Sequence, residues 1–126
     1  MKIRVLTSIL ILSTLTACAS YGTRSAPAML AEGVLAGGNG MTLYTFDKDI
    51  VGSGKSVCND GCAKNWPPLM ARTEDTSSGE YSVITRDDGS RQWAFRGKPL
   101  YYWIKDQKPG DKTGDGVNNV WRVAKP

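Results

Sequence analysis

Two tyrosines and two aspartates recur in this sequence at matching positions, and their types could do chemistry. The segment from Tyr44 to Asp49 reads Tyr-Thr-Phe-Asp-Lys-Asp, and the segment from Tyr101 to Asp106 reads Tyr-Tyr-Trp-Ile-Lys-Asp. Glycoside hydrolases use a pair of carboxylates as acid and as base or nucleophile. One hypothesis is therefore a hydrolase that acts on cell-wall glycan through Asp49 and Asp106.

The two segments belong to one repeated frame, G-x-x-L-Y-x-aromatic-x-x-D, which begins at Gly40 and again at Gly97. Self-similarity of this kind indicates a duplicated structural unit. Alternation along a strand places Tyr44 with Phe46 on one face, and likewise Tyr101 with Trp103.

Two interpretations of these aromatic residues remain open. In the first, they form a core between the two units, while Asp49 and Asp106 accept hydrogen bonds from turn amides. In the second, the tyrosines, aromatic partners and aspartates form a ligand surface at the junction of the units, where binding sites are often found.

Strand and turn signals surround both copies of the motif. Residues 34–36 and 42–46 flank Asn39-Gly40, a dipeptide typical of a two-residue hairpin turn. Residues 81–85, 92–95 and 100–104, separated by turn residues, predict a three-stranded antiparallel meander. Helical signals are weak, apart from one short turn within residues 60–66 that Pro67 would end.

These elements predict an all-β, mainly antiparallel fold. Two pseudo-repeated hairpin or meander units, at about 32–70 and 81–126, would pack into a single domain over residues 32–126. About one hundred residues suffice for one core and leave no room for a second domain.

Cysteine and histidine usage narrows the chemistry. Cys58 and Cys62 are expected to form a disulfide in an oxidising compartment, next to the helical turn. The sequence contains no histidine, which excludes a Ser-His-Asp triad and the H-E-x-x-H zinc motif. No cofactor is expected.

One loop partly imitates a calcium-binding loop. Asp111, Thr113 and Asp115 match the first, third and fifth positions of an EF-hand, but Arg122 stands where the twelfth position needs a glutamate. A glycine-rich turn is therefore favoured over a metal site, although a calcium-binding envelope protein stays an alternative.

The N-terminus has the layout of a signal peptide over residues 1–17. Positive charges at Lys2 and Arg4 precede an apolar run that ends in Leu15-Thr-Ala-Cys18, which resembles the bacterial lipobox. That resemblance implies that Cys18 becomes the lipidated N-terminus, with residues 18–31 as a flexible tether. Two or more acyl chains hold a protein firmly on a membrane. Because Ala19 follows the cysteine, a Gram-negative source predicts the outer membrane, facing the periplasm.

Beyond the membrane, partners are restricted by charge. The formal net charge of +4 would fall to +2 after loss of Lys2 and Arg4, and no basic cluster follows. Nucleic acid is therefore not expected as a partner. An envelope protein or a glycan stays open as a ligand, and the sequence leaves the oligomeric state open.

The motifs together resemble a family of predicted bacterial lipoproteins with a Y-x-(F/W/Y)-x-x-D motif, the secreted repeat of unknown function. The matching stretches are Tyr44-x-Phe46-x-x-Asp49, Cys58-Asn-Asp-Gly-Cys62-Ala, Trp66-Pro67-Pro68-Leu69, Gln92-Trp93-Ala94, Tyr101-x-Trp103-x-x-Asp106 and Pro109-Gly110-Asp111. The resemblance implies a tandem-repeat envelope lipoprotein whose biochemical role is not established. Relatives often carry histidine after the last tryptophan, where this chain has Arg122, so a metal site based on that histidine does not transfer. The leading hypothesis is a membrane-tethered, non-catalytic binding or structural module.

Overall fold

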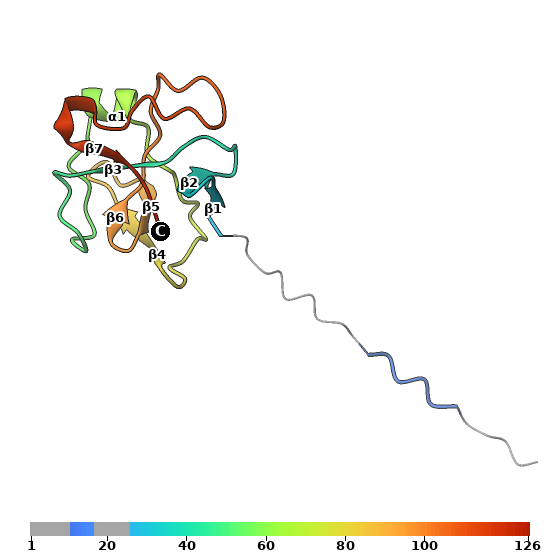
Figure 1. Cartoon of the computed structure of the whole chain (residues 1–126). Helices are drawn as coiled ribbons and strands as arrows, with labels where there is room; N and C mark the ends of the chain where they lie inside the picture. The colour runs from blue at the N-terminus through green and yellow to red at the C-terminus, as the bar shows by residue number, and fades with distance from the viewer. Residues whose placement is uncertain (1–10, 17–25) are drawn as a thin grey trace, which may run out of the picture.

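The structure is a computed structural model that describes residues 11–16 and 26–126, and short antiparallel strands dominate it (Figure 1). In the described part, the strands are β1 (Ala28–Ala31), β2 (Val34–Gly37), β3 (Tyr44–Phe46), β4 (Tyr81–Thr85), β5 (Arg91–Phe95), β6 (Lys98–Pro99) and β7 (Trp121–Val123). A short helix α1 (Gly61–Asn65) and a 3₁₀ turn η1 (Val117–Asn119) complete the elements. The predicted all-β, antiparallel fold class is confirmed. Within the described residues, no helix is both long enough and apolar enough to cross a membrane.

The strands form three small antiparallel sheets, one of which joins the two repeats. The sheets are β1–β2, β3–β7 and β4–β5–β6. In the β3–β7 sheet, Tyr44 pairs with Val123 and Phe46 pairs with Trp121, so the motif strand of the first repeat lies against the last strand of the second (Figure 1). An isolated bridge between Tyr44 and Tyr101 adds a direct link between the two motifs.

The predicted meander over residues 81–104 is confirmed for its first two strands. Its third strand was expected at residues 100–104, which is wrong: β6 lies just before that stretch and pairs with β5 only at Lys98 and Pro99. The backbone beyond β6 turns to other segments: the Tyr101 amide donates to the Tyr44 carbonyl, and the Tyr102 amide donates to the Pro67 carbonyl. Tertiary pairing of the two repeats therefore replaces the local hairpin there.

The predicted hairpin of residues 34–36 with 42–46 is only partly present. The Leu43 amide donates to the Leu35 carbonyl at 2.9 Å, and Ala36 bridges Thr42, but the partner of β3 over its whole length is β7. Strand β3 pairs with β7 instead of completing the hairpin, and this pairing places the aromatic residues Phe46 and Trp121 opposite each other.

The flexible tether expected over residues 18–31 includes a strand at its end, because Ala28–Ala31 forms β1 and pairs with β2. Glu32 and Gly33 both adopt positive φ angles, 50° and 81°, between these strands. Two successive positive φ values define the tight turn that matches the twist of a hairpin. Glu32-Gly33 lacks the Asn-Gly or Asp-Gly signal that is typical of such a turn, so the domain begins earlier than expected.

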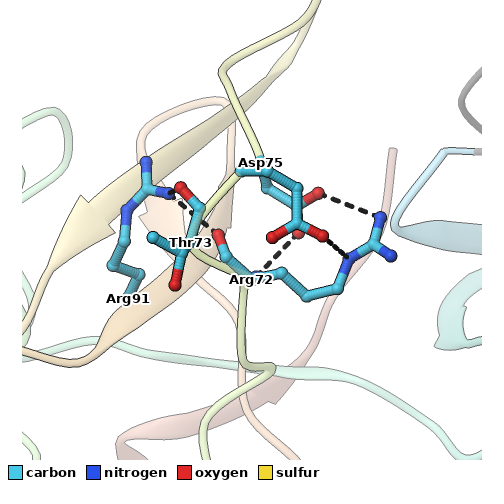
Figure 2. A network of polar contacts seen from close by, with 5 residues as sticks. Arg72, Thr73, Asp75 and Arg91 are labelled. Carbon is cyan, nitrogen blue, oxygen red and sulfur yellow. Dashed lines mark hydrogen bonds and ion pairs between the residues drawn. The ribbon is translucent and has the colours of Figure 1, made fainter.

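Residues 71–80 connect the two repeats and are attached to β5 through polar contacts (Figure 2). The Arg91 guanidinium donates to the carbonyls of Arg72 and Thr73, both at 2.8 Å, and the Arg72 amide donates to Asp75 at 2.8 Å. Bonds from a charged donor to backbone carbonyls are stronger than neutral ones. The connection is thereby held against the meander although it contains no long strand.

Two hydrophobic clusters fill the domain. One is mainly aliphatic and includes Leu35, Leu43, Leu69 and Leu100. The other gathers the buried tyrosines, tryptophans and the disulfide, with Tyr44, Cys58, Trp66, Tyr101 and Trp121 as its members. Alternating residues of the motif strands supply the two clusters, Leu43 to the first and Tyr44 to the second, as expected of strands with two buried faces.

Candidate functional site

Tyr44 and Tyr101 lie at the centre of the second cluster, and each bonds to the aspartate of the other repeat. The Tyr44 hydroxyl donates to Asp106 Oδ2 at 2.6 Å, and the Tyr101 hydroxyl donates to Asp49 Oδ2 at 2.5 Å. The backbones of the two tyrosines also exchange hydrogen bonds, at 2.8 and 3.0 Å. We call this arrangement the crossed tyrosine–aspartate pairs. It ties the two repeats together in both directions.

Each aspartate uses its second oxygen for its own loop. Asp49 Oδ1 accepts from the Val57 amide at 2.8 Å, and Asp106 Oδ1 accepts from the Thr113 amide at 3.0 Å and its hydroxyl at 2.6 Å. Both aspartates are 8% exposed. The expected role as acceptors of turn amides is thus present. The bond to the tyrosine of the other repeat is the part that the sequence did not reveal.

A buried arginine supports one of the two crossed pairs and not the other. Arg86, 4% exposed, donates to Ser56 Oγ at 3.0 Å and to the Cys58 carbonyl at 2.5 Å. Ser56 Oγ lies 2.6 Å from the Tyr101 hydroxyl. On the Tyr44 side, the corresponding contact is the Gly114 amide, 3.2 Å from the hydroxyl. No motif in the sequence points to Arg86, which precedes an ordinary Asp-Asp-Gly turn.

The electrostatics keep the two tyrosine hydroxyls protonated. Burial, and next the hydrogen bond to an aspartate, raises the pKa of Tyr44 and of Tyr101 far above the usual 10.0. Burial also raises the pKa of Asp49, while the Tyr101 hydroxyl, the Val57 amide and the Arg86 charge act in the opposite direction. A phenol that keeps its proton is a dependable donor over the whole neutral range. The arrangement is suited to holding the repeats together, and it leaves no motif oxygen without a donor.

Four aromatic rings form a continuous stack beside these pairs. Phe46 stacks on Trp121 with ring centroids 4.2 Å apart, Trp121 on Trp66 at 3.8 Å, and Trp66 on Trp103 at 3.9 Å. Along the stack, the rings come in turn from the first and the second repeat, in the order Phe46, Trp121, Trp66 and Trp103. The motif aromatics form its two ends, and the two later tryptophans form its middle. Tyr44 meets Trp66 edge-on at 5.4 Å, and Tyr101 meets Trp121 edge-on at 5.2 Å. Such pairs contribute about 0.5–1.5 kcal/mol beyond the area they bury.

The stack leaves no room at Gly114. A Cβ added there would lie 2.8 Å from Trp66 Cη2, 2.9 Å from Tyr44 Cε1 and 3.0 Å from Trp103 Cγ. We predict that Gly114→Ala lowers the free energy of unfolding by about 1–3 kcal/mol, the usual effect of overpacking. Urea unfolding followed by tryptophan fluorescence measures this.

The matched control is Gly61→Ala in α1, where an added Cβ meets nothing within 4 Å. Because alanine favours a helix over glycine, this variant should be unchanged or slightly more stable. Equal unfolding curves for Gly114→Ala and the wild type would contradict the packing described here.

The two cysteines form the expected disulfide, with Cα atoms 5.2 Å apart. It spans the start of α1, and the Trp66 amide closes the helix by donating to the Cys62 carbonyl at 2.8 Å. The predicted helical turn within residues 60–66 is thereby confirmed. The disulfide and the helical turn together fix the position of Trp66 in the stack. Cys18, the predicted lipidation site, lies outside the described residues.

The three residues of the calcium hypothesis have separate partners. Asp111 accepts from the amides of Gln107 and Lys108, Asp115 accepts from the Val123 amide, and Thr113 donates to Asp106. Across residues 11–16 and 26–126, no group of three acidic, cysteine or histidine side chains is close enough to hold a metal ion. These loops serve the crossed pairs and β7.

A shallow groove of about 450 Å³ runs along one side of the stack, at the junction of the repeats. Its apolar wall is formed by Phe46, Trp66 and Trp121, and its polar rim by Lys48, Asn65 and Asn118. We call it the aromatic groove. In the ligand-surface interpretation of the sequence, the motif residues themselves form the site. In the structure Tyr44, Tyr101, Asp49 and Asp106 are buried, and Phe46 is the motif residue that lines the groove.

The geometry defines a tandem β domain whose two halves interlock through crossed tyrosine–aspartate pairs. A family model described as a secreted repeat of unknown function matches residues 31–70 and 82–125. The chain therefore belongs to this family of secreted repeats, and it is exported. Each matched segment contains one copy of the motif. Comparison with curated proteins and with solved structures returns no match.

Proposed function

We propose that this protein is a bacterial envelope lipoprotein, tethered through Cys18, whose β domain is a non-catalytic binding or structural module. Export follows from membership of the secreted family. Support for the anchor comes from the lipobox-like Leu15-Thr-Ala-Cys18, with small and polar residues between the cysteine and β1. In a Gram-negative source the domain faces the periplasm from the outer membrane. Its partners there are the membrane, through the lipid, and an envelope protein or glycan.

The non-catalytic part of this proposal rests on one observation: both motif carboxylates already accept hydrogen bonds from other groups of the protein. A glycosidase needs one carboxyl to protonate the leaving oxygen and another to act on the opposite face of the sugar. Asp49 and Asp106 are buried, and each accepts hydrogen bonds from a tyrosine and from a loop amide. A substrate would have to displace these bonds and open the core. The rival, a hydrolase of cell-wall glycan, requires that opening.

The rival can be tested on purified peptidoglycan with wild-type protein and Asp106→Asn. We expect neither protein to clear the suspension or to release reducing ends. Circular dichroism must show that both are folded at the assay temperature. Clearing by the wild type that Asp106→Asn lacks would establish the hydrolase and overturn the non-catalytic module.

The anchor is tested by replacing Cys18. We predict that Cys18→Ser moves the protein from the membrane fraction to the soluble exported fraction, because the variant removes the site of the acyl chains that would hold the protein on the membrane. Fractionation with a carbonate wash, together with labelling by a radioactive fatty acid, measures this. The control is Cys58→Ser/Cys62→Ser, which keeps Cys18 and should stay labelled and membrane-bound. A Cys18→Ser protein that resists the wash would refute the lipid anchor. Density-gradient separation then tests the outer-membrane placement.

A further inference from the structure

We propose that the aromatic groove binds a β-linked amino-sugar glycan, such as the sugar strand of a cell wall. This inference rests on the proposed function of a binding module, and it names both the site and the chemical class of the ligand. Four properties of the groove carry it: its size and position, its fixed aromatic wall, its unused polar groups, and the absence of a free strand edge.

The size and position of the groove fit a small ligand. Its volume of about 450 Å³ falls within the range of roughly 300–1,000 Å³ that is typical of ligand sites. It lies where β3, the end of α1 and the η1–β7 segment meet, so both repeats contribute to it. Ligand sites favour such junctions, because two units can supply opposite walls.

The wall of the groove is fixed before any ligand arrives. Trp66 and Trp121 are almost parallel, at 4°, and their tyrosine neighbours hold them edge-on from within. Phe46 at the end of the stack is half-buried, so part of its ring faces the groove. The faces of Trp66 and Trp121 are covered by their neighbours in the stack, and the two residues are only 4% and 2% exposed. The apolar C–H groups of a pyranose ring would therefore pack on the exposed part of the Phe46 ring, which the two tryptophans hold from behind. A wall that needs no ordering on binding loses little conformational entropy.

The polar rim carries groups that the fold itself does not use. Lys48, Asn65 and Asn118 are exposed, and their side chains make no hydrogen bond or ion pair within the described residues. Each amide offers two donors and one acceptor, the combination that sugar hydroxyls and acetamido groups require. No aspartate or glutamate lines the groove. Lys48 therefore also accommodates a sugar that bears a carboxylate.

Backbone strain places one of these amides. Asn118 and Asn119 are consecutive left-handed residues, with φ angles of 51° and 59°. Non-glycine residues adopt this conformation at an energetic cost, and such residues concentrate at binding sites. Asn118 lines the groove, whereas the Asn119 side chain accepts a hydrogen bond from Arg122 at 3.5 Å and does not line it. The two neighbours therefore share a conformation and differ in their relation to the groove.

A protein segment is a less suitable occupant because no strand edge is free at the groove. Peptides commonly bind by adding a strand to an exposed edge. Tyr44 in β3 already pairs with Val123 on one side and with Tyr101 on the other. The outer edge of β7 is also occupied, since the Trp121 carbonyl accepts from Gly116 and the Val123 amide donates to Asp115. Recognition at the groove therefore depends on side chains, which favours a sugar.

The test is a titration of the wild-type domain with chitotetraose, the tetramer of β-1,4-linked N-acetylglucosamine. Tryptophan fluorescence and calorimetry give the Kd. We expect Asn118→Gly to weaken binding about fivefold, the effect of losing one hydrogen bond of roughly 1 kcal/mol. Glycine accepts the positive φ at this position, so the variant removes the amide without straining the backbone.

Asn119→Gly is the matched control, because it changes an adjacent asparagine of the same conformation outside the groove. It should bind as the wild type does. Maltotetraose, an α-linked glucose tetramer without acetamido groups, should not bind. Equal affinity of Asn118→Gly and the wild type, or equal binding of both sugars, would overturn the proposal.

Co-sedimentation with purified cell-wall sacculi separates this inference from the proposed function. Retention of the wild-type protein on sacculi with no response to chitotetraose would refute the groove as the site while leaving a binding module in place. A failure to bind sacculi, tetramer or any protein of an envelope extract would refute the binding module itself. Capture of an envelope protein that Asn118→Gly abolishes would replace the glycan by a protein and so overturn the ligand class.

Discussion

Replacement of Tyr44 or Tyr101 by alanine is expected to lower the free energy of unfolding by about 3–5 kcal/mol, as for other large aromatic residues removed from a core. Both side chains are 0% exposed, and both meet a tryptophan edge-on. Each truncation also leaves a buried aspartate without its hydroxyl donor. The two variants should lose similar amounts, because the contacts are nearly symmetric. Urea denaturation measures the loss, and unchanged unfolding curves would show that these tyrosines are not core residues.

A double-mutant cycle then distinguishes the crossed pairs from pairs within one repeat. Tyr44→Phe combined with Asp106→Ala should show a coupling energy of about 1–3 kcal/mol, since the two side chains share a buried hydrogen bond. Tyr44→Phe combined with Asp49→Ala should be nearly additive, although these residues belong to the same motif copy. Coupling within a copy and none across copies would contradict the arrangement.

The domain is expected to lose stability steeply above pH 10. The pKa of Tyr44 and that of Tyr101 are raised in the folded protein, by burial first and then by their aspartate partners, from the usual 10.0. Below pH 10 the two phenols are neutral in both the folded and the unfolded protein, and their contribution to the free energy of unfolding is fully present. Above it the unfolded phenols lose protons that the folded ones keep. The free energy of unfolding then falls by about 1.4 kcal/mol per pH unit for each tyrosine, and by about 2.7 kcal/mol per pH unit for the pair. The fall ends when the pH passes the pKa of the tyrosines in the folded protein.

Absorbance of tyrosinate near 295 nm, followed together with circular dichroism, measures this effect. The two buried phenols should ionise only as the protein unfolds. Tyr44→Phe/Tyr101→Phe is the control and should have a shallower dependence of stability on pH. A residual slope is expected from Tyr81 and Tyr102, because burial raises the pKa of each. Early ionisation of all tyrosines in the folded state would contradict the burial of the pair.

The sequence predicted those features that depend on local pattern. Alternation placed Tyr44 with Phe46, and strand and turn signals predicted the β4–β5 pairing. The disulfide was expected of two cysteines in an oxidising compartment, and the helical turn of a segment that ends before Pro67. Burial of the tyrosines agrees with the core interpretation of the motif. The ligand-surface interpretation placed the motif residues at a site. The groove lies beside them, and none of the residues on its polar rim stands at a marked position of the shared frame.

The crossing of the pairs could not be predicted, for a physical reason. Strand periodicity tells which face a side chain occupies, but two identical motifs fit equally well whether each tyrosine bonds to its own aspartate or to the other one. The choice depends on β3 pairing with β7, a long-range contact without a local signal. Arg86 was missed because its partners, a carbonyl and polar side chains, come from two other segments, the loop before α1 and β5. β1 was missed because its turn, Glu32-Gly33, lacks the Asn-Gly or Asp-Gly signal of a two-residue hairpin.

The crossed pairs also determine the order in which the domain can form. The Tyr44–Asp106 bond spans 62 residues of chain, and β3 finds its partner only in the last strand, at Trp121 to Val123. Long-range contacts of this kind form late, because loop closure costs entropy before the contact stabilises anything. Neither half is complete alone: the first half lacks an acceptor for Tyr44, and the second lacks one for Tyr101. A chain that lacks residues 101–123 can close neither crossed pair and cannot form the β3–β7 sheet, so the domain is expected to fold as one cooperative unit.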